Sequence, residues 1–461
     1  MNARTRALGL SQLWLLAAAI TLGYAPTGIA QDEKPKPQVL ITNVNIFDGF
    51  SDKLATGMSV LVEGNHIKEV GKSIKADGAT VIDGGGRTMT PGLIDMHGHN
   101  TFHTPEGTNT FTYEWDFGGA GALAAQALRD DMLMKGITSV RDIAGNSRGI
   151  ANAIQRNLLI GPRLYTSGGV LSHTGGHGDW GAKNDAEPND YGVLIQQSYI
   201  VDGREDVIRA SRRNFRGGAD FTKIMAGGGV SSMFDPLEIL GATKEEVEAA
   251  VEIATDYGTY VAVHAYHDKS YNRALDAGVR SFEHGFLVTE PTVKRMAKMI
   301  AEGKKIAWSF QCYMSVNSFG SYETMPPFFT HEQKLKGVAV GKGARNAAKL
   351  MKKHGVFTIG GADMFGPGLK EKIKEDLTCN VDAGFTPAEA LKHWTGNAGI
   401  VLKWSGPLDP YPTYKIGTIK KGAYADLLLW KGNPLDDIKL ILDESKLQLI
   451  MKDGKIYKNT L

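Results

Sequence analysis

The chain has 461 residues, too many for one ordinary domain of roughly 100–200 residues, and this length suits one large barrel-type domain with a smaller companion. Hydrophobic residues make up 42% and charged residues 22%, a globular balance that excludes a mainly disordered or coiled-coil chain. Lys and Arg total 52 against 50 Asp and Glu, so the chain lacks the positive excess of a general nucleic-acid binder, and we expect no nucleic-acid partner.

Residues 1–30 have the pattern of a secretory signal peptide. Arg4 and Arg6 precede the apolar run LWLLAAAITLGYA, and a small-residue cleavage motif ends at Ala30. A membrane anchor is the alternative, but the run is shorter than the ~20 residues that a spanning helix needs. We therefore expect cleavage after Ala30, a periplasmic or secreted protein, and no stable membrane insertion of the mature chain.

Both ends of the remaining chain predict short β-strands with Gly-containing turns, over residues 38–49, 57–71, 425–430 and 447–457. Neither end has enough strands to form a stable sheet alone. We therefore expect residues 31–90 and 405–461 to combine into one small β-sandwich.

Residues 91–404 alternate apolar strands with amphipathic helices. Three helix–strand pairs are the clearest, at residues 245–258 with 259–266, 290–304 with 305–310, and 344–355 with 356–363. Repeated pairs of this kind predict a parallel sheet, and the length suits a (β/α)₈ TIM barrel. A doubly wound open sheet is the alternative, but no Gly-rich dinucleotide-binding motif opens a first strand–helix turn. The two cysteines, Cys312 and Cys379, could form at most one disulfide, and the sequence leaves open whether they meet.

Metal-binding residue types occur at the ends of the predicted barrel strands, where barrel active sites are built. His97 and His99 are two residues apart, so on a strand both imidazoles face the same side. Lys223 interrupts an apolar strand, where a buried lysine is unfavourable unless it is paired or chemically altered. Each such residue alone could be structural, but their joint placement at strand ends predicts one functional site, formed by His97, His99, Lys223, His264, His284 and Asp363.

This residue set, with the flanking segments 86–99 and 416–430, resembles the metal-dependent amidohydrolase superfamily over residues 38–458. Residues 174–179 and 223–232 resemble the branch that holds imidazolonepropionase-like proteins, prolidase-like metallo-carboxypeptidases and ochratoxin-hydrolysing amidases. The resemblance implies a (β/α)₈ barrel with a small β-sandwich formed from both chain ends.

The resemblance also implies two divalent metal ions per chain, of which Zn²⁺ is expected. One ion is expected on His97, His99 and Asp363, and the other on His264 and His284. Carbon dioxide, held as a carbamate on Lys223, is expected to bridge them. A bridging hydroxide would attack the substrate, and Asp363 would carry the proton to the leaving amine.

Two further residues are candidates for substrate contact. His177 lies in a Gly-rich loop, where a purely structural role is the alternative, and Tyr266 shares the strand face of His264. We expect an exported hydrolase of amide bonds in small N-acyl-amino-acid or peptide substrates, present as a homo-oligomer. The alternatives are a hydrolase of cyclic amides or lactones, a deaminase, and a binding protein without catalysis. Lys223 argues against a deaminase, and the complete ligand set argues against a binding protein.

Overall fold

The computed structural model describes residues 36–101, 117–181, 183, 196–364 and 372–461. The chain divides into two units, Met1–Lys36 and Pro37–Leu461, and the second holds every element named below. The predicted signal peptide lies outside the described residues. In the described part of the chain, no helix combines the length and the apolar character needed to cross a membrane.

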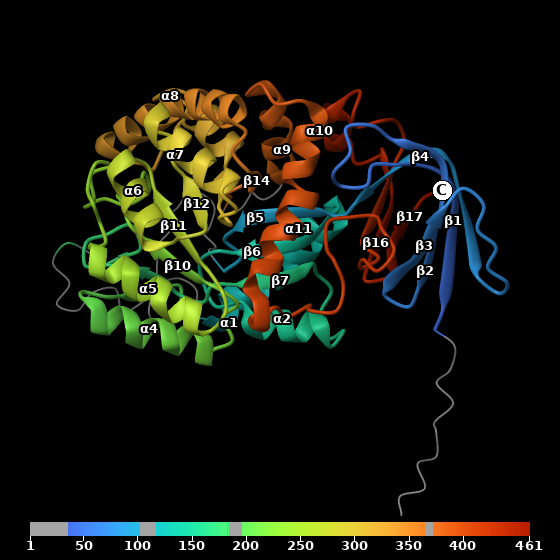
Figure 1. Ribbon diagram of the computed structural model, residues 1–461, viewed down its shortest axis with the longest axis horizontal. Helices are drawn as coiled ribbons and strands as arrows, with labels where there is room; N and C mark the ends of the chain where they lie inside the picture. Colours follow the sequence, from blue (N-terminus) through green and yellow to red (C-terminus); the bar gives the residue numbers. More distant parts are fainter. Residues whose placement is uncertain (1–35, 102–116, 182, 184–195, 365–371) are drawn as a thin grey trace, which may run out of the picture. The chain divides into compact units, whose positions relative to one another are not determined.

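Strands from both ends of the chain form one seven-stranded sheet, in the order β17-β16-β15-β4-β1-β2-β3. Its strands are β1 (Gln38–Ile46), β2 (Ala55–Glu63), β3 (His66–Gly71), β4 (Thr80–Pro91), β15 (Leu427–Trp430), β16 (Leu447–Lys452) and β17 (Lys455–Asn459). The two ends meet where β4 pairs antiparallel with β15, with Thr90 opposite Leu428. In Figure 1 the blue strands near the N-terminus and the red strands near the C-terminus accordingly lie together.

The remaining strands pair in parallel, as a β-α repeat predicts. They form two sheets, of order β14-β13-β12-β11-β10-β8-β9 and β5-β6-β7. Their bounds are β5 Leu93–Gly98, β6 Ile137–Asp142, β7 Arg163–Thr166, β8 Val170–Ser172, β9 Ser198–Ile200, β10 Thr222–Met225, β11 Val261–Ala265, β12 Ser281–His284, β13 Ala307–Phe310 and β14 Thr358–Gly360. A parallel bridge between Gly98 and Met364 brings the end of β5 to the segment after β14. This strand order agrees with the predicted (β/α)₈ barrel.

Helices follow the strands along the chain and pack around them (Figure 1). They are α1 Phe117–Ala127, α2 Arg148–Gln155, α4 Arg204–Arg216, α5 Lys244–Asp256, α6 Asp268–Ala277, α7 Glu290–Ala301, α8 His331–His354, α9 Ile373–Asp382, α10 Pro387–His393 and α11 Gly396–Leu402. Helix α5 shows how the sequence forms them: Thr243 and Glu246 make a capping box, and Val247, Ala250 and Ile253 form its buried stripe. The following strand, β11, is buried at every position.

Helix α8 is longer than the sequence predicted. Residues 344–355 were expected to be helical, but the helix begins at His331 behind a capping box of Thr330 and Gln333. Three glycines in this helix, at positions 337, 341 and 343, lower intrinsic helix propensity and obscure the pattern. Packing requires small residues there: a Cβ at Gly341 would lie 2.2 Å from the carbonyl oxygen of Phe319.

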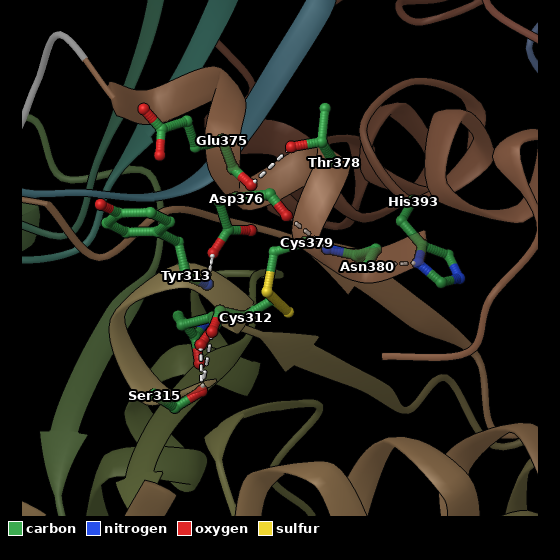
Figure 2. Close-up of a disulfide and its surroundings, with 10 residues drawn as sticks. Cys312, Tyr313, Ser315, Glu375, Asp376, Thr378, Cys379, Asn380 and His393 are labelled. Carbon is green, nitrogen blue, oxygen red and sulfur yellow. Dashed lines mark hydrogen bonds between the residues drawn. A yellow bond between two sulfur atoms is a disulfide. The ribbon is translucent and has the colours of Figure 1, made fainter. Parts of the chain in front are cut away.

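Cys312 and Cys379 form a disulfide, with their Cα atoms 5.7 Å apart. Both cysteines are buried. Figure 2 shows the bridge joining the segment after β13 to α9. The structure therefore answers the question that the sequence left open, because the two cysteines form a disulfide.

Candidate metal centre

All six predicted ligands line one pocket, together with the two predicted substrate contacts. The pocket holds about 700 Å³ of empty space, part of it continuous with solvent. These lining residues are His97, His99, His177, Lys223, His264, Tyr266, His284 and Asp363. The ends of parallel barrel strands thus bring together residues that are up to 266 positions apart, from 97 to 363.

His97, His99 and Asp363 form the tightest cluster. The Oδ1 atom of Asp363 lies 2.9 Å from Nε2 of His99 and 3.5 Å from Nε2 of His97. One ligand atom from each residue lies within 4.8 Å of the other two, the spacing that a shared metal ion requires. The backbone N–H of Asp363 also donates to the carbonyl oxygen of His97 at 2.9 Å. Gly361 permits this approach, because a Cβ there would lie 2.6 Å from the Cβ of His97.

His264 and His284 end the neighbouring strands β11 and β12. Their rings are 4.5 Å apart, and the ring of His284 is 5.0 Å from that of His97. Burial lowers the pKa of these three histidines well below the ordinary value, and neighbouring histidines and Lys223 act in the same direction. The imidazoles are therefore neutral, which is the form that binds metal ions.

Lys223 lies in β10 and is 1% exposed. Burial lowers the pKa of its ammonium group to about 8, while Glu283 acts in the opposite direction. More of its amine is therefore neutral near pH 7 than in an exposed lysine, and a neutral amine can add carbon dioxide. Neutral imidazoles, an aspartate and an amine of this kind fit divalent ions such as zinc.

His177 and Tyr266 lie beside the histidines. The ring of His177 stacks on that of His264 with centroids 4.1 Å apart, and its Nδ1 lies 2.7 Å from the hydroxyl of Ser232. The ring of Tyr266 is 5.3 Å from that of His284. Both residues thus line the pocket directly beside predicted ligands.

Three buried polar residues behind the ligands were missed by the sequence reasoning. Glu283 lies 2.8 Å from Nδ1 of His97 and receives a hydrogen bond from Arg141 at 2.8 Å. Gln311 receives one from the backbone N–H of His284 at 3.2 Å. The signal that identified Lys223, a charged residue inside an apolar strand, was also present at Arg141 in β6 and at Glu283 in β12.

Several apolar side chains also line the pocket. They come from β10 and the loop after it, from the segment after β13, and from the segment before α8. They include Met225, Val230, Met314, Phe319 and Phe329. The pocket therefore combines the potential metal ligands with apolar side chains, and these five are called its apolar wall.

Comparison with known proteins agrees with this geometry. The model described as "Amidohydrolase family" matches residues 88–457. Ochratoxinase from Aspergillus niger is 29% identical over 383 residues, which cover 80% of this chain and 75% of ochratoxinase.

Solved structures show the same similarity. The crystal structure of A. niger ochratoxinase has a TM-score of 0.78 and 26% identity, covering 92% of this chain and 96% of that one. The crystal structure of a prolidase complexed with N-methylphosphonate-L-proline has a TM-score of 0.81 and 30% identity, covering 92% and 100%. The resemblance drawn from the sequence is thus confirmed. This chain belongs to the amidohydrolase family and is a hydrolase that acts on amide bonds.

Proposed function

We propose that the protein is a binuclear metal-dependent amidohydrolase for small N-acyl-amino-acid or peptide substrates, acting as a dipeptidase or carboxypeptidase. The observation that carries the proposal is the convergence of four histidines, Asp363 and buried Lys223 in one pocket. The cluster of His97, His99 and Asp363 supports one ion site. His264 and His284 would hold the second ion, with carboxylated Lys223 between the two.

Divalent ions at these positions would polarise the substrate carbonyl and lower the pKa of an attacking water. The chain's own residues supply proton transfer and orientation. The Asp363 side chain is 20% exposed, whereas that of His97 is 1% exposed, so the Asp363 carboxylate is open to the substrate side. It can accept a proton and pass it to the leaving nitrogen. Because an amide nitrogen is a poor leaving group, this second transfer is needed for the bond to break.

The apolar wall supports a substrate with a sizeable apolar group beside its amide. Met314, Phe319 and Phe329 offer a surface on which such a group loses contact with water. His177 and Tyr266 would contact the polar part of the substrate. The similarity to ochratoxinase and to the prolidase described above supports an amide or dipeptide substrate.

The test is hydrolysis of a panel of dipeptides and N-acyl-amino acids by purified enzyme, with cyclic amides and lactones as comparators. Asp363→Asn, prepared in parallel, controls for contaminating hydrolases. We expect linear amides to be cleaved, and elemental analysis to find about two divalent ions per chain. Preference for the cyclic substrates would favour the alternative function, and one ion in fully active enzyme would favour a mononuclear centre.

We also propose that the protein is exported to the periplasm or the medium. The signal-peptide pattern of residues 1–30 supports this. So does the Cys312–Cys379 disulfide, because disulfides persist in oxidising compartments. Mass spectrometry of the protein from its native host should find an N-terminus at or near Gln31. An intact Met1 in the soluble protein would contradict export.

A further inference from the structure

Gln311 lies between two of the proposed metal ligands. It directly follows β13, and its side chain is fully buried. Its Oε1 accepts a hydrogen bond from the backbone N–H of His284 at 3.2 Å, and its Nε2 donates to Oγ of Ser309 at 2.7 Å. The same Nε2 lies 3.0 Å from Nδ1 of His97. One amide group therefore contacts residues from both β5 and β12.

His284 needs this support because its backbone is strained. Its φ is +67°, in the left-handed region that residues with a side chain rarely adopt, and such a conformation persists only where its surroundings enforce it. Gln311 holds its N–H, and the indole N–H of Trp308 donates to its carbonyl oxygen at 2.6 Å. Without the Gln311 amide, a buried N–H would lose its partner. The turn that aims the His284 imidazole would then lose one of these two supports.

The position of Gln311 is itself set from α9. Cys312, the next residue, is bonded to Cys379 of that helix. The backbone N–H of Tyr313 donates to Oδ2 of Asp376, one turn earlier in α9, at 2.8 Å. Figure 2 shows both connections side by side. The chain directly after Gln311 is thus held by one covalent bond and one hydrogen bond.

We propose that Gln311 is a positioning residue of the metal centre and that the Cys312–Cys379 bridge sets its position. The bridge holds Cys312, Cys312 fixes Gln311, and Gln311 accepts a hydrogen bond from the backbone N–H of His284 and packs its Nε2 beside the imidazole of His97 without a hydrogen bond to it. The inference rests on the proposed role of these two histidines as metal ligands. It requires that the bridge and Gln311 affect metal affinity through the same contact, the hydrogen bond from the backbone N–H of His284 to Gln311.

The first test is Gln311→Ala, with zinc affinity measured by chelator competition and ligand geometry by the visible spectrum of the cobalt-loaded protein. Outer residues that orient ligands typically change metal affinity about 10- to 100-fold, and we expect a loss in that range with an altered spectrum. Asn214→Ala is the matched control, because its buried amide oxygen likewise accepts a hydrogen bond from a backbone N–H, that of Gly169, at 3.0 Å. Unchanged affinity in Gln311→Ala, or an equal loss in both variants, overturns the proposal.

The second test removes the bridge with Cys312→Ala and Cys379→Ala together, in the wild-type and in the Gln311→Ala backgrounds. We expect zinc affinity to fall in the wild-type background and to fall little further in Gln311→Ala. If the double cysteine variant does not fold, the disulfide can instead be reduced with a phosphine in the folded wild type and in folded Gln311→Ala. Circular dichroism then checks that both reduced proteins remain folded, and their zinc affinities are compared in the same way. No loss in the wild type would show that the bridge does not act on the metal centre, and equal losses in the two backgrounds would show that it acts by a route other than Gln311. Either result overturns the proposal.

These measurements need no substrate, so they separate this inference from the proposed substrate class. If the protein binds two ions but hydrolyses none of the tested dipeptides and N-acyl-amino acids, the proposed substrate class is wrong. The effect of Gln311 on metal affinity can still be measured. A wild-type chain that binds no divalent ion refutes both.

Discussion

Glu283 connects Arg141 to the proposed metal ligand His97. Its Oε1 accepts a hydrogen bond from Arg141 at 2.8 Å, and its Oε2 lies 2.8 Å from Nδ1 of His97. Burial raises the pKa of Glu283, but Arg141 and Lys223 outweigh this effect and lower it below the ordinary value. An ionised carboxylate can only accept, so His97 carries its proton on Nδ1. Its Nε2, on the side of Asp363, is then free to bind a metal ion.

Glu283→Gln should therefore weaken metal binding. We expect about a 10- to 100-fold loss of zinc affinity, because the histidine loses the partner that orients it. The variant should also lose about 3–5 kcal/mol of stability, because Arg141 keeps a buried charge without its counter-ion. Chelator competition and urea unfolding measure the two effects. Glu246→Gln, at a buried capping box remote from the pocket, should leave zinc affinity unchanged.

Lys223→Ala should lose metal and activity together, because the carbamate that we propose between two ions cannot form. A short carboxylic acid added with the metal should restore part of both. Lys374→Ala is the matched control: Lys374 is also buried, burial lowers its pKa to about 8, and it does not line the pocket. Metal content and hydrolysis rate are measured for both variants, and we expect both quantities to fall only in Lys223→Ala. Near-wild-type activity in Lys223→Ala would refute the binuclear centre.

Asp363→Asn should separate metal binding from proton transfer. The amide keeps one coordinating oxygen, so most of the metal and substrate affinity should remain. It cannot carry the proton, so kcat should fall about 10²–10⁴-fold. An amide substrate should suffer more than an activated ester with the same acyl group, whose leaving group needs less protonation. Equal losses on both substrates would mean that Asp363 only binds the metal or orients the attacking water.

Phe329→Ala should reduce selectivity for apolar substrates. Phe329 is buried in the apolar wall of the pocket, whereas its neighbour Phe328 is 41% exposed and does not line it. We expect kcat/KM for a substrate with an aromatic side group to fall about 10- to 200-fold relative to that for its alanine analogue. Phe328→Ala should leave that ratio unchanged. A loss shared by both substrates would indicate damage to the fold rather than to substrate recognition.

His393 should make stability depend on pH. It is buried in α10 beside Asn380, and burial lowers its pKa from 6.5 to about 4. As the pH falls through 6.5 the unfolded chain takes up a proton on His393, whereas the folded chain does not do so until about pH 4. Its contribution is therefore complete above pH 6.5 and is lost progressively down to pH 4, a total of about 3 kcal/mol.

The measurement is urea unfolding at several values between pH 4 and pH 7, for the wild type and His393→Gln. Other titrating groups are common to both proteins, so the difference between the curves isolates His393. We expect the wild type to lose more stability than the variant as the pH falls. Parallel curves would show that His393 protonates alike in the folded and unfolded chains.

The sequence predicted the position of the site because the rule involved is local. A histidine at the end of an apolar strand points to one rim of a parallel sheet wherever that strand lies in the barrel. His264 and His284 could therefore be grouped before their neighbours were known. The same reasoning stopped short at α8, because its glycines are needed for contacts with Phe319 and Phe286, which only the folded chain makes.

The sequence by itself determined the fold class, the family and the potential metal ligands that line the pocket. Strand alternation, turn residues and strand-end positions are properties of short segments, and they were sufficient for these. Only the tertiary structure decided that Glu283 faces His97, 186 residues away, that Gln311 supports the backbone of His284, and that Cys312 meets Cys379. Those contacts depend on how the barrel strands align with one another, and no spacing along the chain specifies that alignment.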